Sequence, residues 1–123
     1  MKFIPRFFHG VLDYLTSLVL MIAPNVFGFA EAGGPAVWVP RIVGLMILLQ
    51  AMITEYELGL IKMIPINMHL MTDYVAAAFL VFAPWLFGFG QHVTPTITLV
   101  VAGGLVGGVT LLTEPRGRPR IMA

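Results

Sequence analysis

The sequence predicts an all-α membrane protein with four transmembrane helices that arise from a tandem duplication of a two-helix unit. The first observation is composition: 59% of the 123 residues are hydrophobic and 11% are charged, whereas a soluble domain carries roughly 25% charged residues. The second is a set of four long apolar segments, and the third is that the chain matches itself at an offset of sixty residues. Together they predict a single transmembrane domain over residues 1–123 in a lipid bilayer.

The four apolar segments cover residues 11–29, 36–54, 66–89 and 93–112. As a helix, each is long enough to cross about 30 Å of hydrocarbon. No segment shows the strand-like alternation that a barrel would need, and a backbone in lipid must satisfy its own hydrogen bonds. A four-helix bundle is therefore the expected architecture.

The internal match divides nearly the whole chain into two repeats. Repeat one covers about residues 4–55, repeat two covers about residues 64–114, and a basic tail follows at 115–123. Because each repeat holds two helices, we expect parallel halves related by a pseudo-twofold axis along the membrane normal. The matched pairs include His9 and His69, Asp13 and Asp73, Tyr14 and Tyr74, Pro24 and Pro84, Pro35 and Pro95, Gly44 and Gly104, and, after one deletion, Thr54 and Thr113.

The first apolar segment also has features of a secretory signal peptide, because Lys2 and Arg6 precede it. Asp13 within the segment argues against that alternative. So does the recurrence of the segment at residues 64–89, where a signal could not act. We therefore expect the segment to remain as the first helix.

Helices one and three end in proline and aromatic residues. We expect the proline to break or kink each helix and the aromatic rings to anchor at the outer membrane interface. Pro35 and Pro95 then lie near the first turns of helices two and four, where a missing N–H costs little. The residues of this repeat signature are Pro24, Phe27, Gly28, Phe29, Pro84, Trp85, Phe87, Gly88 and Phe89.

The second copy of this signature, residues 83–89, resembles the motif of the SPW repeat membrane proteins, which is Ser-Pro-Trp within a unit of two transmembrane helices. Ala83 replaces the serine, and the first copy has Ala23 and Asn25 at the serine and tryptophan positions. Residues 54–69 also resemble the segment between repeats in that family. The resemblance implies a small bacterial or archaeal integral membrane protein, and it implies no activity or cofactor.

Helix four is rich in glycine, which allows helix backbones to approach closely. Helix two has only Gly44, so we expect the additional glycines to contact another subunit, in a homo-oligomer or a larger membrane complex. The helix-packing residues are Gly103, Gly104, Gly107 and Gly108.

The basic residues predict an orientation. With four alternating helices, Arg41 lies on one side and all other Lys and Arg residues lie on the opposite side, so both termini should be cytoplasmic. The basic tail suits anionic lipid headgroups. The net charge of +1 gives no indication of nucleic-acid binding, and the absence of cysteine excludes disulfides and cysteine nucleophiles.

Ionisable residues gather at the predicted cytoplasmic ends of the helices. His9 and Asp13 are four residues apart, as are His69 and Asp73, so each pair shares a helical face. We expect each pair to form a polar clamp, cross-linked to a glutamate, because an unpaired carboxylate in a membrane is costly. The predicted polar cluster comprises His9, Asp13, Tyr14, Glu55, His69, Asp73, Tyr74 and Glu114.

Three classes of function follow. The first is a non-enzymatic structural or interaction bundle, favoured because no nucleophile with a base and no phosphate-binding loop is evident. The second is a proton- or ion-coupled channel or carrier that uses the polar cluster. The third is a metal- or quinone-dependent membrane enzyme, which requires His9 and His69 to converge, although the Glu-x-x-His spacing of di-iron bundles is absent. We predict no cofactor.

Overall fold

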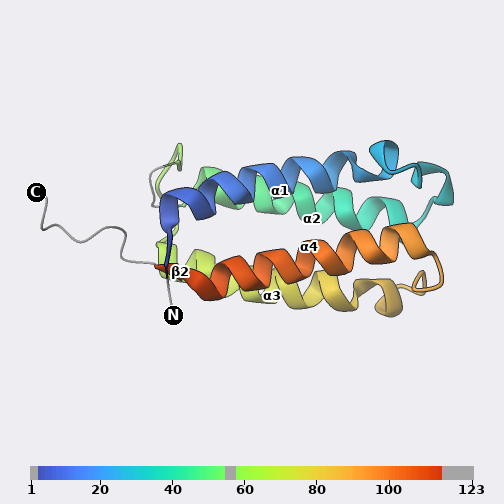
Figure 1. Cartoon of the computed structure of the whole chain (residues 1–123). Helices are drawn as coiled ribbons and strands as arrows, with labels where there is room; N and C mark the ends of the chain where they lie inside the picture. Colours follow the sequence, from blue (N-terminus) through green and yellow to red (C-terminus); the bar gives the residue numbers. More distant parts are fainter. Residues whose placement is uncertain (1–2, 55–57, 115–123) are drawn as a thin grey trace, which may run out of the picture.

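The computed structural model describes residues 3–54 and 58–114 as a bundle of four long helices lying side by side (Figure 1). All four are long and apolar enough to cross a membrane, as predicted. A short 3-10 helix, η1 (Ala30–Ala32), follows the first helix, and two-residue strands β1 (Ile4–Pro5) and β2 (Thr113–Glu114) flank the bundle in sequence. The long helices are α1 (Arg6–Val26), α2 (Pro35–Met52), α3 (Ile66–Leu86) and α4 (Val93–Leu112).

Helix α1 begins at Arg6, five residues before the apolar segment that predicted it. Pro5 precedes it with an extended backbone, and Pro65 precedes α3 in the same way. Proline fits there because its fixed φ suits the position and its missing N–H would have no helical partner. As a result, His9 lies within the helix and not in a loop before it.

Glycine, not proline, ends α1 and α3. Helix α1 continues through Pro24 to Val26, and Gly28 then adopts a φ of +79°. The Phe29 N–H donates to the Pro24 carbonyl at 2.9 Å, the bond of a Schellman motif in which glycine supplies the left-handed residue. Helix α3 ends in the same way, with Gly88 at a φ of +78°. Of the two predicted effects of proline, a break or a kink, the break is therefore wrong, because Pro24 and Pro84 lie inside their helices.

This turn divides the aromatic residues of the repeat signature into two groups. Phe29 and Phe89, which follow the glycines, fold inward and are 5% and 4% exposed. Trp85, Phe27 and Phe87 remain on the surface, where rings at the end of a membrane-spanning helix meet the headgroup region. Two of the expected interface anchors are thus core residues, because the reversal of the chain turns them toward the bundle.

The helices associate as two hairpins. Helix α1 packs chiefly on α2, and α3 packs chiefly on α4 (Figure 1). Apolar side chains from all four helices meet between the hairpins, while the outer surface carries many large apolar side chains, as a lipid-facing surface does. The buried cluster comprises Leu20, Ala36, Val39, Val43, Ile47, Leu80, Ala83, Phe89 and Leu99.

One glycine in each hairpin allows close contact between its helices. A Cβ atom on Gly44 would lie 2.7 Å from the Ser17 carbonyl oxygen, and one on Gly103 would lie 2.8 Å from that of Ala77. Gly103 is therefore the counterpart of Gly44, whereas the sixty-residue offset had matched Gly44 with Gly104. The structural match of these two glycines therefore differs by one residue from the match predicted by the sequence.

The other glycines of α4 point in different directions. A Cβ atom on Gly107 would make an ordinary contact with Ala77 at 3.4 Å. Nothing lies within 4 Å of such an atom on Gly104 or Gly108. Within the described residues, Gly103 and Gly107 thus serve the hairpin, while Gly104 and Gly108 face outward.

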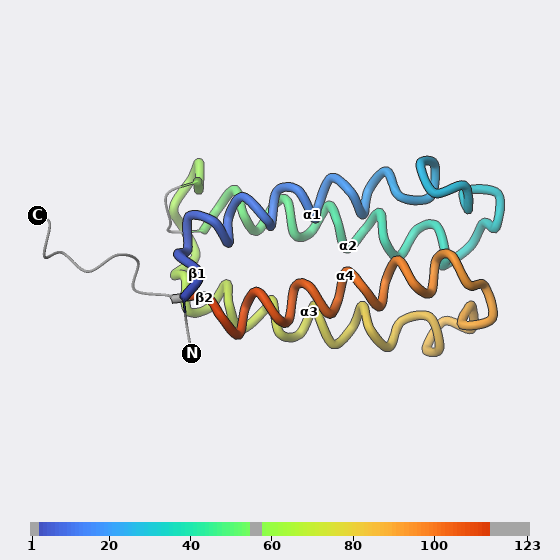
Figure 2. The backbone as a smooth tube through the Cα atoms, viewed as in Figure 1, coloured from blue at the N-terminus to red at the C-terminus, as the bar shows by residue number. Residues whose placement is uncertain are grey.

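The two hairpins are also joined by backbone pairing at one end of the bundle (Figure 2). Ile4 of β1 pairs with Thr113 of β2 in parallel register, and Thr54 after α2 forms a parallel bridge with Ile64 before α3. Thr113 thus lies beside Ile4, just before α1, and Thr54 lies beside Ile64, just before α3. These are the two helices that carry His9 and His69.

Candidate functional site: a buried histidine and aspartate ring

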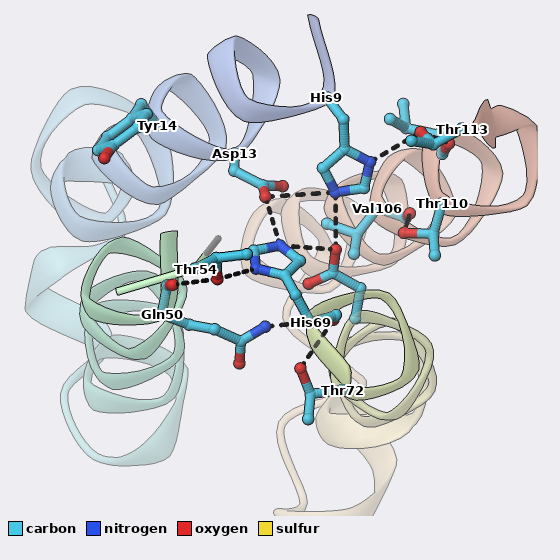
Figure 3. A network of polar contacts seen from close by, with 12 residues as sticks. His9, Asp13, Tyr14, Gln50, Thr54, His69, Thr72, Val106, Thr110 and Thr113 are labelled. Atoms are coloured by element: carbon cyan, nitrogen blue, oxygen red, sulfur yellow. Dashed lines mark hydrogen bonds and ion pairs between the residues drawn. The ribbon is translucent and has the colours of Figure 1, made fainter. Parts of the chain in front are cut away.

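Two histidines and two aspartates meet in the centre of the bundle, near the end that carries β1 and β2. Helix α1 supplies His9 and Asp13, and α3 supplies His69 and Asp73. Figure 3 shows His9, Asp13 and His69 directed toward one another. All four are nearly inaccessible to solvent, with exposed fractions of 1% to 5%. Because residues four apart share a helical face, each helix presents its pair to the other.

The shortest contacts in this ring run between the helices. His9 Nε2 lies 2.7 Å from Asp73 Oδ2, and His69 Nε2 lies 2.7 Å from Asp13 Oδ2. Within each helix, the corresponding nitrogen–oxygen distance is 3.2 Å. The predicted pairs therefore exist, but their strongest partners lie across the bundle axis, so the ring links the two hairpins and not merely the turns of one helix.

Two threonines hold the other nitrogen of each imidazole. His9 Nδ1 lies 2.8 Å from Thr113 Oγ1, and His69 Nδ1 lies 2.6 Å from Thr54 Oγ1. Both hydroxyls are fully buried. Since Thr54 follows α2 and Thr113 follows α4, the network draws on residues from all four helices or their ends. We call the four ring residues with these two threonines the polar network.

The hydrogen bonds of the threonines determine which ring nitrogen carries a proton. Thr54 Oγ1 donates its only hydrogen to the Gln50 carbonyl at 2.6 Å, and Thr113 Oγ1 donates to the Val109 carbonyl at 2.6 Å. Each hydroxyl must therefore accept from the imidazole, so both Nδ1 atoms carry hydrogen. Both Nε2 atoms face the aspartates.

The ring then requires two further protons. A nitrogen–oxygen distance of 2.7 Å is that of a charge-assisted hydrogen bond, and each of the two short contacts needs one hydrogen between its atoms. Two carboxylates and two imidazoles that share two such protons have no net charge. This balance suits an apolar interior, where an uncompensated charge is very costly.

The threonines are the members of the polar network that the sequence analysis did not predict. Their signal was present, because Thr54 and Thr113 were matched between the repeats. The predicted polar cluster contains instead the acidic residue that follows each of them. Glu55 lies outside the described residues, and only the backbone of Glu114 is described, in β2. Their role as cross-links stays a prediction, and the threonines are the cross-links found among the described residues.

The predicted tyrosines do not extend the ring. The Tyr14 hydroxyl donates to the Leu58 carbonyl at 2.8 Å and so contacts the connection between α2 and α3. Figure 3 shows its side chain directed away from His9. Tyr74, at the matching position of α3, is 41% exposed. The two tyrosines therefore share a sequence position but have different surroundings.

An apolar groove reaches the ring from one side. It has a volume of about 430 Å³ and lies between α2 and α3, with Asp73, Gln50 and Thr72 as its polar lining residues. The Gln50 side-chain amide donates to the His69 carbonyl at 3.2 Å. The corresponding groove between α1 and α4 has a volume of about 340 Å³ and is not lined by either aspartate.

The comparisons with known proteins agree with the resemblance seen in the repeat signature. A family model described as the SPW repeat domain matches residues 7–113. No curated protein and no solved structure gives a match. The matched residues include all four long helices apart from Arg6, the first residue of α1, and the whole polar network. With four helices apolar enough to span a bilayer, this small integral membrane protein belongs to the SPW repeat family.

Proposed function

We propose that this protein is a non-enzymatic membrane bundle that self-associates through α4, with the polar network as the internal lock between its hairpins. The observation that carries this proposal is the crosswise pairing of His9 with Asp73 and of His69 with Asp13, both at 2.7 Å. In this proposal the hairpins are copies from a tandem duplication, and both termini are cytoplasmic.

In a bilayer the hydrophobic effect does not drive the two hairpins together, because lipid tails are as apolar as the helix surfaces. Specific packing and buried polar contacts must then hold the hairpins together. Contacts between hairpins are less extensive than contacts within them. The polar network is buried and joins α1 to α3. Its hydrogen bonds therefore link the two hairpins, between which packing contacts are less extensive.

The surface proposed for self-association is the outward face of α4. Gly104 and Gly108 are four residues apart and have open space around them, so a second helix could approach this face closely. Exposed apolar side chains of Val101, Leu105 and Leu111 flank them. A second copy of the same face is the proposed partner.

Oligomeric state in a bilayer or detergent tests this function. We expect the wild-type chain to form dimers or higher oligomers, and the double variant Gly104→Leu, Gly108→Leu to be monomeric at the same protein-to-detergent ratio. Leu49→Ala, at an exposed position of α2 and outside the proposed surface, is the matched control and should retain the wild-type state. A wild-type chain that is monomeric in lipid nanodiscs at all ratios would overturn the proposal.

The convergence of the ring favours a second candidate, a proton-coupled carrier. The ring holds shared protons in the interior, and the groove between α2 and α3 reaches Asp73. Proteoliposomes with a trapped pH indicator test this function. A proton flux that is lost in Asp13→Asn and retained in Glu31→Gln, whose site lies in η1, would favour the carrier. An absence of flux in the wild-type chain would reject it.

A further inference from the structure

We propose that the ring is a binding site for one Zn²⁺ ion, held by Nε2 of both histidines and one carboxylate oxygen of each aspartate. The donor atoms of His9, Asp13, His69 and Asp73 all lie within 4.8 Å of one another. This site has a structural role in the bundle, and it does not depend on whether the protein self-associates.

The distances suit a small cation. With metal–ligand bonds of about 2.1 Å, two ligand atoms are about 3.4 Å apart in a tetrahedral site. The four observed contacts around the ring are 2.7 and 3.2 Å, as expected where hydrogen bonds draw the same atoms together. Replacing the protons by an ion therefore requires the short contacts to widen by less than about 1 Å.

The surroundings of the histidines are those of metal ligands. A metal-bound imidazole usually donates its second N–H to an acceptor that fixes its orientation. Here the Nδ1 hydrogens are donated to Thr54 and Thr113, which are themselves anchored to backbone carbonyls. This arrangement directs the Nε2 atoms of both histidines at the centre of the ring before any ion arrives.

Charge and ligand type select the ion. Two carboxylates balance the charge of a divalent cation, so the ion takes the place of the two shared protons and the buried site stays neutral. Two imidazole nitrogens with two carboxylate oxygens suit Zn²⁺ better than Mg²⁺ or Ca²⁺, which prefer oxygen ligands alone. Four protein ligands also form the closed coordination of a structural zinc site.

Cobalt and zinc titrations test the site. Untagged protein is purified in detergent, stripped with a chelator and titrated with Co²⁺, whose visible absorption reports tetrahedral coordination. We expect one Co²⁺ per chain, displaced by Zn²⁺, and a higher melting temperature in the presence of Zn²⁺. His9→Gln and His69→Gln should lose this absorption, whereas His92→Gln, at the start of α4, should retain it.

The threonine variants keep all four proposed metal ligands. They provide a second test of the site if the histidine variants do not fold. Thr54→Val and Thr113→Val should weaken Co²⁺ binding about 10- to 100-fold, the usual effect of removing such a supporting hydrogen bond. The proposal is overturned if the wild-type chain shows no saturable binding, or if folded His9→Gln protein binds Co²⁺ as the wild type does. Oligomeric state, measured in the same samples, reports separately on self-association.

Discussion

At the scale of single residues, the orientation of the buried histidines depends on two small hydroxyl groups. Each threonine accepts from an imidazole and donates to the carbonyl four residues before it. A threonine in a helical turn often makes the second bond. The first bond arises because the helix end is buried beside a histidine of the other hairpin.

Replacing Thr113 with valine should therefore destabilise the bundle. Valine keeps the volume but leaves the His9 Nδ1 hydrogen buried without its acceptor, and we expect the free energy of unfolding to fall by about 1–3 kcal/mol. SDS titration in mixed micelles, followed by circular dichroism, measures the change. Thr98→Val is the control, since the hydrogen bond that Thr98 donates to the Thr94 carbonyl of its own helix is exposed. Equal stability of the two variants would contradict the prediction.

Loss of one aspartate should have a larger effect. Asp73→Ala leaves two buried imidazoles with one carboxylate, and removing one partner from a buried ionic group typically costs about 3–5 kcal/mol. The same unfolding assay is suitable. Glu31→Ala, an acidic residue on the surface, should lie within about 0.5 kcal/mol of the wild type. A small effect of Asp73→Ala would indicate that the ring is not an important link between the hairpins.

At the scale of helices, the sequence pattern predicted the elements well but not how they end. Four apolar segments became four helices within a few residues of the expected bounds. Proline usually breaks or kinks a helix, yet Pro24 and Pro84 lie inside their helices. The Phe-Gly-Phe ending carries the actual stop signal, because glycine adopts the left-handed conformation that a Schellman motif requires.

The two inward glycines should not tolerate a side chain. In Gly44→Ala and in Gly103→Ala, the new methyl group would lie within 2.8 Å of a backbone oxygen on the adjacent helix, and overpacking of this kind costs about 1–3 kcal/mol. Thermal unfolding in detergent measures the loss. Gly104→Ala is the matched control on the same helix and should be neutral or slightly stabilising, since alanine favours helix and the site is open. Equal losses in all three variants would argue against close packing at Gly44 and Gly103.

At the scale of the whole molecule, the proposed orientation can be tested without removing any native thiol, because the chain contains no cysteine. We expect Glu31→Cys, in the loop between α1 and α2, to react with an impermeant maleimide in intact cells. Leu60→Cys, an exposed position in the α2–α3 connection, should react only after the membrane is opened. The opposite pattern would place both termini outside.

By itself, the sequence determined the elements, the family and the chemical content of the site. These depend on local properties: apolar length gives a membrane-spanning helix, and a spacing of four places His9 with Asp13 and His69 with Asp73 on one face of a helix. Such properties can be worked out along the chain, one segment at a time.

Only the tertiary structure decided how the site is connected. The crosswise bonds, the support of His9 by Thr113 and the match of Gly44 with Gly103 join residues that are far apart in sequence. Helical periodicity predicts which residues share a face of one helix, but it does not predict which faces of two helices pack against each other. That choice depends on how closely two hairpins pack and on the loops between helices, where a difference of one residue changes every later match.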